Sequence, residues 1–352
     1  MIDLSVCIIT RDQSVKLHRC LQELSKFDFE KVILDTGSRD NSIEVAGQFS
    51  KNVHEFEWCD DFSAAKNAAI SFASHDMIMF LDTDEYLQTF DEKKFLSQEE
   101  ENRDNIGRIH FFNSYTQDGL EMQFEEWLGR IFDRRIYRYS GKIHEQLTPI
   151  FEDREVKYYN SLASVIHDGY DLTKEELQIK ADRNRRLLLS EIEKDPSDPY
   201  MYYQLGKSEY AVKRYEEAAR YCKNALDLSP SFELKYVEDL IESYGYALLN
   251  TSRAEQALSE LSAFWDNFSN SADFAFLMGL ILMNNAKFDE AVNTFVAATR
   301  LGESRVRGAG SFMAWYNAGV IREVQGQKKE AKKFYKKCGS YPPAIEGLKR
   351  VR

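Results

Sequence analysis

The chain has 352 residues, too many for one ordinary domain, so two domains are expected. Hydrophobic residues make up 43% of it and charged residues 30%, a balance that is typical of globular proteins and excludes a disordered or fibrous chain. Acidic residues outnumber basic ones, 58 against 46, and the net charge is −12. Because such a surface would repel a nucleic-acid backbone, no nucleic-acid partner is expected.

The cysteines and the apolar runs indicate in which cellular compartment the protein is expected. The five cysteines lie far apart without CxxC spacing, which favours reduced thiols over a disulfide frame or a zinc site. The N-terminus lacks a signal-peptide pattern, and the longest apolar run, about 274–283, is too short to span a bilayer. We therefore expect a cytoplasmic protein without a transmembrane segment.

The first part of the chain alternates short apolar runs with helix-like stretches. Strands are predicted at 4–10, 31–35, 53–56 and 77–81, and helices at 14–24, 41–49 and 63–73. This alternation predicts an α/β domain with a parallel sheet and helices on both faces. Ligands of such sheets bind at the carboxyl ends of the strands, so functional residues are expected there.

The second part of the chain is predicted to be all-α. From residue 198 onward strand signals all but disappear, and four glycines are each followed twelve residues later by an alanine. The pairs are Gly206 and Ala218, Gly245 and Ala257, Gly279 and Ala291, and Gly319 and Ala331. The pattern resembles the tetratricopeptide repeat (TPR), in which small residues let two antiparallel helices approach closely.

Two carboxylates, Asp82 and Asp84, follow the apolar run 77–81. Two oxygen ligands one residue apart can share a hard divalent cation that also binds a diphosphate. The other interpretation is a strand-to-turn junction in which aspartate only caps the chain.

The segment 35–42 follows the second predicted strand. Asp35 ends that strand, Gly37 permits a tight turn, and Ser38 or Asp40 can cap the next helix. Asp35 could hold a base or ribose near the helix start, although an ordinary strand-to-helix turn would use the same residues.

Four segments together resemble the family 2 glycosyltransferases. They are VCIITR at 6–11, LDTGSRD at 34–40, FSAAKN at 62–67 and LDTD at 81–84, in the order and spacing of that family. The resemblance covers about the first 170 residues. It implies the GT-A fold, a Rossmann-like domain with a mixed sheet, and a nucleotide-diphospho-sugar as donor.

The resemblance also implies roles for individual residues. The residues expected to bind the donor are Thr10, Arg11, Asp35, Ser38, Lys66, Asn67, Asp82 and Thr83. Asp82 and Asp84 would hold Mg²⁺ or Mn²⁺ on the diphosphate. Lys66 departs from the pattern, because the family more often has arginine there, and lysine cannot bind phosphate in a bidentate manner.

A narrower resemblance follows from GKIHE at 141–145 together with the repeats, a combination similar to the bacteriocin S- and O-glycosyltransferases of the sublancin type. It implies that His144 is a further metal ligand. Glu145 could be the general base that deprotonates the acceptor, and Asp61 and Glu126 are rival bases. Three arginines, Arg130, Arg134 and Arg135, could bind the diphosphate or could simply form a solvated face.

The expected organisation is a GT-A domain at 1–172, a linking helix at 173–197 and a TPR-like domain at 198–352. The expected activity is metal-dependent inverting transfer of a hexose, with UDP-glucose the first choice of donor. The acceptor would be Cys or Ser/Thr of a ribosomally made bacteriocin precursor, bound in the groove of the repeats. Alternatives are a cell-envelope saccharide or lipid acceptor and a non-catalytic repeat scaffold. The similar enzymes also suggest a homodimer.

Overall fold

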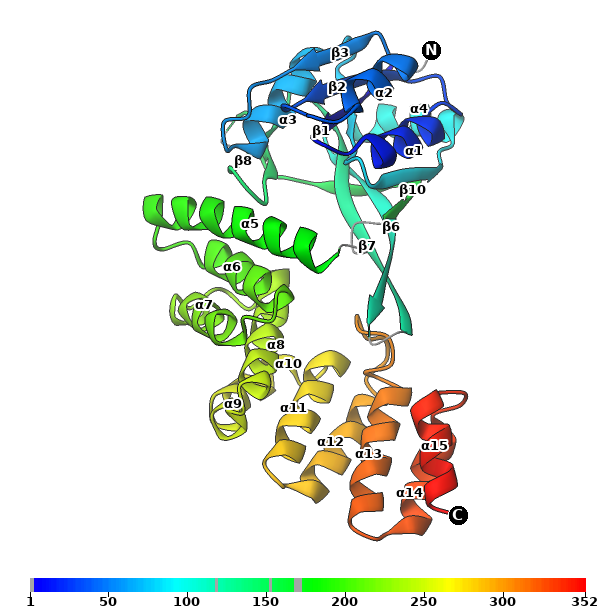
Figure 1. Cartoon of the computed structure of the whole chain (residues 1–352), viewed down its shortest axis with the longest axis vertical. Helices are drawn as coiled ribbons and strands as arrows, with labels where there is room; N and C mark the ends of the chain where they lie inside the picture. Colours follow the sequence, from blue (N-terminus) through cyan, green and yellow to red (C-terminus); the bar gives the residue numbers. More distant parts are fainter. Residues whose placement is uncertain (1–2, 118–119, 152–153, 168–172) are drawn as a thin grey trace. The chain divides into compact units, whose positions relative to one another are not determined.

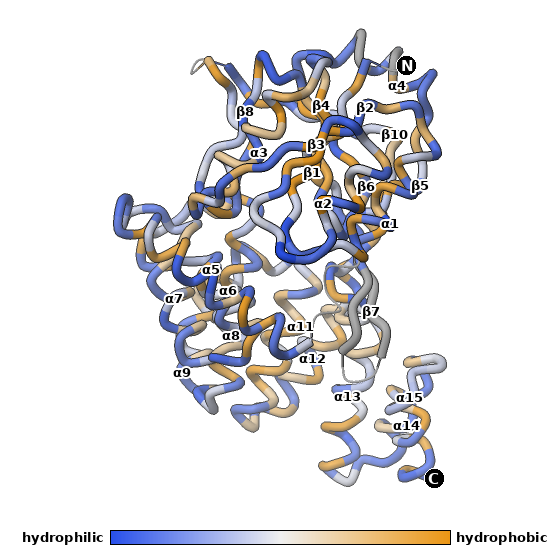
Figure 2. The backbone as a smooth tube through the Cα atoms, turned by 45° about the horizontal axis from the view of Figure 1, so that its top comes forward, coloured by the Kyte–Doolittle hydropathy of each residue, from blue (hydrophilic) through white to orange (hydrophobic). Residues whose placement is uncertain are grey.

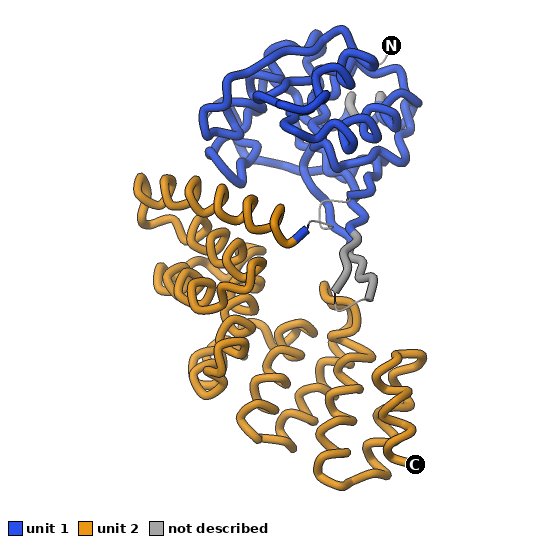
Figure 3. Tube along the Cα trace, in the orientation of Figure 1, with its two compact units in different colours: residues 1–173 blue, residues 174–352 orange. Residues whose placement is uncertain are grey.

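The structure is a computed structural model that describes residues 3–117, 120–151, 154–167 and 173–352. The chain divides into two compact units, residues 1–173 and 174–352 (Figures 1 and 3). The first unit is built around a sheet and the second contains only helices in its described part.

The first unit contains a mixed eight-stranded sheet in the order β3-β2-β1-β4-β7-β6-β10-β5 and a separate pair, β8-β9. The strands are β1 (Leu4–Thr10), β2 (Glu30–Asp35), β3 (Asn52–Glu55), β4 (Met77–Phe80), β5 (Glu85–Thr89), β6 (Ile106–Gln117), β7 (Leu120–Asp133), β8 (Tyr137–Ser140), β9 (Gln146–Pro149) and β10 (Tyr158–His167). Strands β1 to β4 pair in parallel, whereas β7 is antiparallel to both β4 and β6. The predicted fold, an α/β domain with a mixed sheet, is confirmed.

Four helices accompany this sheet: α1 (Ser14–Leu24), α2 (Ser42–Phe49), α3 (Phe62–Ser71) and α4 (Glu92–Asn102). Helix α1 buries Leu17, Leu21 and Leu24, which recur at helical spacing and pack into one core with β1. Figure 2 shows β1 and β4 as mostly hydrophobic, as expected for strands with neighbours on both sides and covered faces. Because these strands are parallel, the residues after their carboxyl ends lie along one edge of the sheet.

The second unit is a series of antiparallel helices (Figure 1). They are α5 (Lys174–Lys194), α6 (Pro199–Ala211), α7 (Tyr215–Asp227), α8 (Lys235–Asn250), α9 (Ala254–Leu261), the 3₁₀ turn η1 (Ser262–Phe264), α10 (Trp265–Phe268), α11 (Ala272–Asn284), α12 (Phe288–Ala298), α13 (Phe312–Val324), α14 (Lys328–Lys337) and α15 (Pro342–Arg350). Within the described residues, no helix is both long and apolar enough to cross a bilayer.

The repeat glycines act as predicted. A Cβ added at Gly206 would lie 2.6 Å from Cys222 Sγ, and one added at Gly279 would lie 2.6 Å from the ring of Phe295. No real Cβ approaches its neighbours so closely, so the paired helices depend on the missing side chains. The predicted helical-hairpin repeat is confirmed.

Candidate active site

The candidate site lies where β1, β2 and β4 end. Asp35, at the end of β2, is 1% exposed, and its Oδ1 accepts hydrogen bonds from the N–H groups of Gly37 and Ser38, each at 2.8 Å. Within the part of the chain described, Asp35 Oδ2 and the buried Thr10 Oγ1 have no hydrogen-bond partner. Because buried polar atoms are normally satisfied, these two oxygens suit a polar ligand such as a nucleoside.

The loops after β1 and β2 are tied together by side chains. Asp12 donates its N–H to Ser38 Oγ at 2.9 Å and accepts from the N–H of Arg39 at 2.6 Å. Ser38, predicted to bind the donor, therefore also fixes the shape of this edge. Arg11, the residue between Thr10 and Asp12, is exposed.

The two aspartates after β4 are each paired with cations of the chain. Asp82 Oδ2 lies 3.2 Å from Arg130 Nη2, and Asp82 Oδ1 lies 3.6 Å from Lys66 Nζ. Although burial opposes it, the charges of Lys66 and Arg130 hold the pKa of Asp82 well below its usual range. Asp84 Oδ2 lies 3.5 Å from Lys16 Nζ. The predicted carboxylate pair is thus at the strand exit and only partly exposed.

Lys66 is a buried cation at the centre of this network. Its side chain is 4% exposed, its Nζ lies 2.6 Å from Glu145 Oε1, and it faces the rings of Phe80 and Tyr139 at 4.6 and 4.9 Å. Burial would lower the pKa of Lys66, but Asp82 and Glu145 raise it above its usual range. The ammonium group is therefore permanently charged between two carboxylates that were predicted to act on the donor and the acceptor.

Arg130, on β7, joins Asp82 to a further carboxylate. Its Nη2 lies 2.5 Å from Glu85 Oε1, and Glu85 Oε2 accepts the N–H of Asp82 at 2.9 Å. Burial raises the pKa of Glu85 to about 8.

The other two arginines lie apart from this network. Arg134 donates to the carbonyls at the end of α3, and Arg135 pairs with Asp133. The diphosphate role suggested for these two residues therefore has no support in the geometry of the described residues.

Several predicted residues hold the local fold. Asp61 caps α3 by accepting the N–H of Ala64 at 2.8 Å. Asn67 donates from Nδ2 to the carbonyl of Tyr139 at 2.9 Å and accepts the N–H of Tyr139 at Oδ1 at 3.0 Å. These two hydrogen bonds hold β8 against α3. Thr83 is 8% exposed, within the turn that carries the two aspartates.

The 141–145 motif reaches the Lys66 network. His144 lies between β8 and β9 with φ +51°, in the left-handed region. The next residue, Glu145, makes the ion pair with Lys66 described above. The motif and the strand exits therefore belong to one site.

The comparisons with known proteins agree with this geometry. The model named Glycosyl transferase family 2 matches residues 5–150, the part of the chain that carries the edge just described. Residues 5–150 form a family 2 glycosyltransferase domain. Two models named Tetratricopeptide repeat match residues 199–232 and 276–344, so the glycosyltransferase domain is fused to TPR repeats.

Two curated relatives each match more than half of this chain. A TPR repeat-containing protein of Synechococcus elongatus is 29% identical over 69% of this chain and 62% of its own length. The SPbeta prophage-derived glycosyltransferase SunS of Bacillus subtilis is 25% identical over 62% of this chain and 52% of its own. The alignments therefore leave more than a third of each relative uncovered. Among solved structures, the TPR protein YrrB is 23% identical over half of this chain and 84% of its own, with a TM-score of 0.40, too distant to support an argument.

One residue of the glycosyltransferase domain was missed as a functional candidate. His167 ends β10, where it pairs in register with Glu85 of β5, and its Nε2 lies 3.8 Å from Asp84 Oδ1. Residues 168–170, which follow His167 in the sequence, lie outside the described residues. The register of β10 against β5, which decides its position, has no local sequence signal.

The possible metal ligands of the glycosyltransferase domain suit a divalent cation that takes few of its ligands from the protein. The described ranges contain no group of three or more His, Cys, Asp or Glu side chains arranged around one ion. Two carboxylates, with an imidazole nearby, nevertheless suit Mg²⁺ or Mn²⁺, because such ions take several of their oxygens from a diphosphate and water. The ligand role predicted for His144 stays a prediction.

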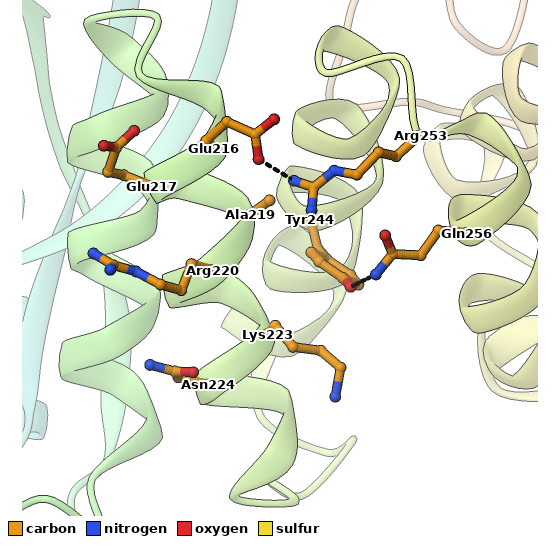
Figure 4. Close-up of a pocket in the computed structure, with 9 residues that line it drawn as sticks. All are labelled: Glu216, Glu217, Ala219, Arg220, Lys223, Asn224, Tyr244, Arg253 and Gln256. Atoms are coloured by element: carbon orange, nitrogen blue, oxygen red, sulfur yellow. Dashed lines mark hydrogen bonds and ion pairs between the residues drawn. The ribbon is translucent and has the colours of Figure 1, made fainter.

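A separate surface pocket of about 430 Å³ lies in the TPR unit, between α7, α8 and α9 (Figure 4). Its lining is mixed in charge: Glu216, Glu217, Ala219, Arg220, Lys223, Asn224, Tyr244, Arg253 and Gln256. Arg253 pairs with Glu216 at 2.9 Å, and Gln256 donates to Tyr244 at 3.3 Å. Several of its polar groups are thus engaged with one another, and the pocket offers no set of groups suited to sugar transfer.

Proposed function

We propose that the protein transfers a hexose, with UDP-glucose the first donor to test, onto Cys or Ser/Thr of a ribosomally made peptide of the bacteriocin type. The observation that carries the proposal is the placement of Asp82 and Asp84 at the exit of β4, beside two buried cations. The family 2 model and the likeness to SunS support the reaction class. The likeness to SunS and the TPR repeats support a peptide acceptor.

Each residue has a distinct part in the proposed reaction. Thr10 and Asp35 would hold the nucleoside through their unsatisfied oxygens. Lys66 and Arg130 would contact phosphate oxygens, and Asp82 and Asp84 would hold Mg²⁺ or Mn²⁺. When bound there, the cation would neutralise the charge that develops on the leaving diphosphate.

The acceptor would react in a single inverting displacement. Its sulfur or oxygen loses a proton to a carboxylate and bonds to the anomeric carbon, while the bond from that carbon to the diphosphate oxygen breaks. A cysteine acceptor needs the least help, since a few per cent of an ordinary thiol is already ionised at neutral pH. Of the predicted bases, Glu145 contacts this network directly, through its ion pair with Lys66.

The test is a mass-spectrometric assay with UDP-glucose, Mg²⁺ or Mn²⁺ and a panel of Cys- and Ser-containing precursor peptides. We expect a mass increase of one hexose on peptide, and its loss in D82A/D84A. Transfer to an envelope saccharide or lipid, with none to peptide, would favour the alternative acceptor. Failure to bind or hydrolyse any nucleotide sugar would favour a repeat scaffold.

The TPR unit can be tested through its effect on acceptor recognition. Because the two units are separately compact, residues 1–173 produced alone are expected to keep slow UDP-sugar hydrolysis but to bind peptide poorly. An unchanged KM for peptide in this truncation would contradict a role of the repeats in acceptor binding. Sedimentation of the full chain would test the predicted homodimer.

A further inference from the structure

A chain of three buried or half-buried polar side chains leads from the middle of β7 to Asp84. Glu126 Oε1 accepts a hydrogen bond from Asn113 Nδ2 at 3.1 Å. Asn113 Oδ1 lies 2.8 Å from His167 Nδ1, and His167 Nε2 lies 3.8 Å from Asp84 Oδ1. Asn113 itself is 1% exposed, so its amide group has little access to water.

The chemistry of these groups fixes the direction of each hydrogen bond. An ionised carboxylate can only accept, so Glu126 must face the NH₂ of Asn113. The carbonyl oxygen of the same amide must then face His167, and because that oxygen can only accept, His167 must donate from Nδ1. A neutral His167 consequently carries its proton on Nδ1 and has a lone pair on Nε2, the atom nearest Asp84.

The distance between Nε2 and Asp84 suits a shared cation better than a direct contact. At 3.8 Å it is too long for a hydrogen bond. Neighbouring ligands of an octahedral ion, each about 2.1 Å from it, are about 3.0 Å apart, so a small movement of either side chain would bring both atoms into one coordination sphere. Histidine ligands of metal ions ordinarily donate their other ring N–H to a protein oxygen, which fixes their orientation.

We propose that Glu126 is a positioning residue and not the acceptor base: through Asn113 it fixes His167 as the Nδ1–H tautomer, so that Nε2 faces the cation held by Asp84. The cation part of this inference rests on the proposed function. The tautomer part does not, since it can be measured on the metal-free protein. Glu126 was one of three candidate bases, so its removal from the list leaves Glu145 and Asp61.

The same unit contains a matched control far along the chain from this site. Glu30 Oε1 accepts from Asn52 Nδ2 at 3.1 Å, and Asn52 Oδ1 lies 2.5 Å from His54 Nε2. This second carboxylate–amide–imidazole chain lies at the amino ends of β2 and β3. The candidate site, by contrast, lies at the carboxyl ends of the parallel strands. By the same reasoning His54 donates from Nε2, so the two histidines are expected to be opposite tautomers.

The first experiment reads the tautomers directly. Nitrogen-15 NMR of the imidazoles in the metal-free wild-type protein at pH 8, assigned with H167N and H54N, is expected to show Nδ1–H for His167 and Nε2–H for His54. A His167 signal typical of the Nε2–H tautomer or of imidazolium would overturn the proposal, whether or not the protein proves to be a glycosyltransferase.

The second experiment moves the carboxylate from position 126 to position 113. In N113D/E126Q, the new carboxylate at position 113 accepts from both His167 and the amide introduced at position 126, so the tautomer is retained. We expect Mn²⁺ affinity, measured by titration calorimetry, within about 3-fold of wild type in this variant and about 10-fold or more weaker in N113L. N52L, the control, should bind Mn²⁺ as wild type does. Equal affinities in N113L and wild type would contradict the coupling.

The third experiment separates positioning from base catalysis. The amide introduced by E126Q can present either its oxygen or its NH₂ to Asn113, so the tautomer of His167 is no longer fixed. We expect weaker Mn²⁺ affinity in this variant, and a kcat at saturating Mn²⁺ within a few-fold of wild type. A catalytic base contributes about 10²- to 10⁴-fold. A loss of kcat of that size in E126Q, with unchanged Mn²⁺ affinity and an unchanged His167 tautomer, would assign Glu126 as the base and overturn the proposal.

Discussion

The ammonium group of Lys66 lies 2.6 Å from Glu145 Oε1, with the lysine side chain 4% exposed. This pair joins the 62–67 segment to the 141–145 motif, two parts of the sequence that were assigned separate roles in donor and acceptor chemistry. Both segments therefore contribute to one ion pair that is largely shielded from water.

Replacing Lys66 by methionine is expected to cost about 3–5 kcal/mol of unfolding free energy, because Glu145 and Asp82 lose a buried partner. Chemical denaturation would measure the loss. The double variant K66M/E145Q should recover part of it, since the glutamine carries no charge. Losses that simply add in the double variant would show that the two residues are not coupled.

Replacing Asp84 by alanine is expected to abolish hexose transfer with little effect on thermal unfolding. Its carboxylate is partly exposed and its pair with Lys16 is long, at 3.5 Å, so the folded state depends little on it. D82A should abolish transfer and also lower the melting temperature, because Lys66 and Arg130 both lose a carboxylate partner. Normal transfer by D84A would remove the metal assignment.

Stability of the TPR unit is expected to depend on pH through Glu242. This residue is 5% exposed and lies 2.7 Å from Arg305; burial and the carboxylates of Asp273 and Asp239 raise its pKa from 4.5 to about 8. A raised pKa means that the folded form holds the proton more tightly, so this contribution is present below pH 4.5 and is lost as the pH rises to 8. E242Q should therefore gain about 2–4 °C in melting temperature over wild type between pH 5 and pH 9. A difference that does not change with pH would show that Glu242 does not titrate there.

Adding a methyl group at Gly279 is expected to destabilise the TPR unit by about 1–3 kcal/mol, because its Cβ would clash with Phe295. Gly47, within α2, has no atom within 4 Å of an added Cβ, and G47A should stabilise the first unit by about 0.5–1 kcal/mol. Urea titrations of both variants would compare them. An unchanged midpoint for G279A would mean that α11 and α12 can move apart.

The sequence was most informative where structure is local. The first four strands and three helices were predicted within two residues, because apolar runs bounded by turn residues set them. The strands β6 and β7 were not predicted, since they mix polar and aromatic residues and pair with each other over a long antiparallel register. That register has no counterpart in a local pattern.

The site was predicted unevenly for the same reason. Asp82 and Asp84 follow their strand directly, so sequence alone places them. The burial of Lys66, the part of Arg130 in the network and the position of His167 arise only when β7 and β10 join the sheet. Asn113 offered no signal, because an asparagine inside a strand is read from sequence as an ordinary polar residue.

The two cationic side chains beside Asp82 bear on whether the protein needs a metal ion in order to fold. Lys66 and Arg130 already compensate the charge of this carboxylate, so the edge of the sheet does not need an added ion to become stable. We therefore expect the chain to fold in the presence of a chelator and, if it acts as proposed, to bind its cation afterwards, together with the nucleotide. Assembly of the polypeptide and supply of the metal would then be separate events.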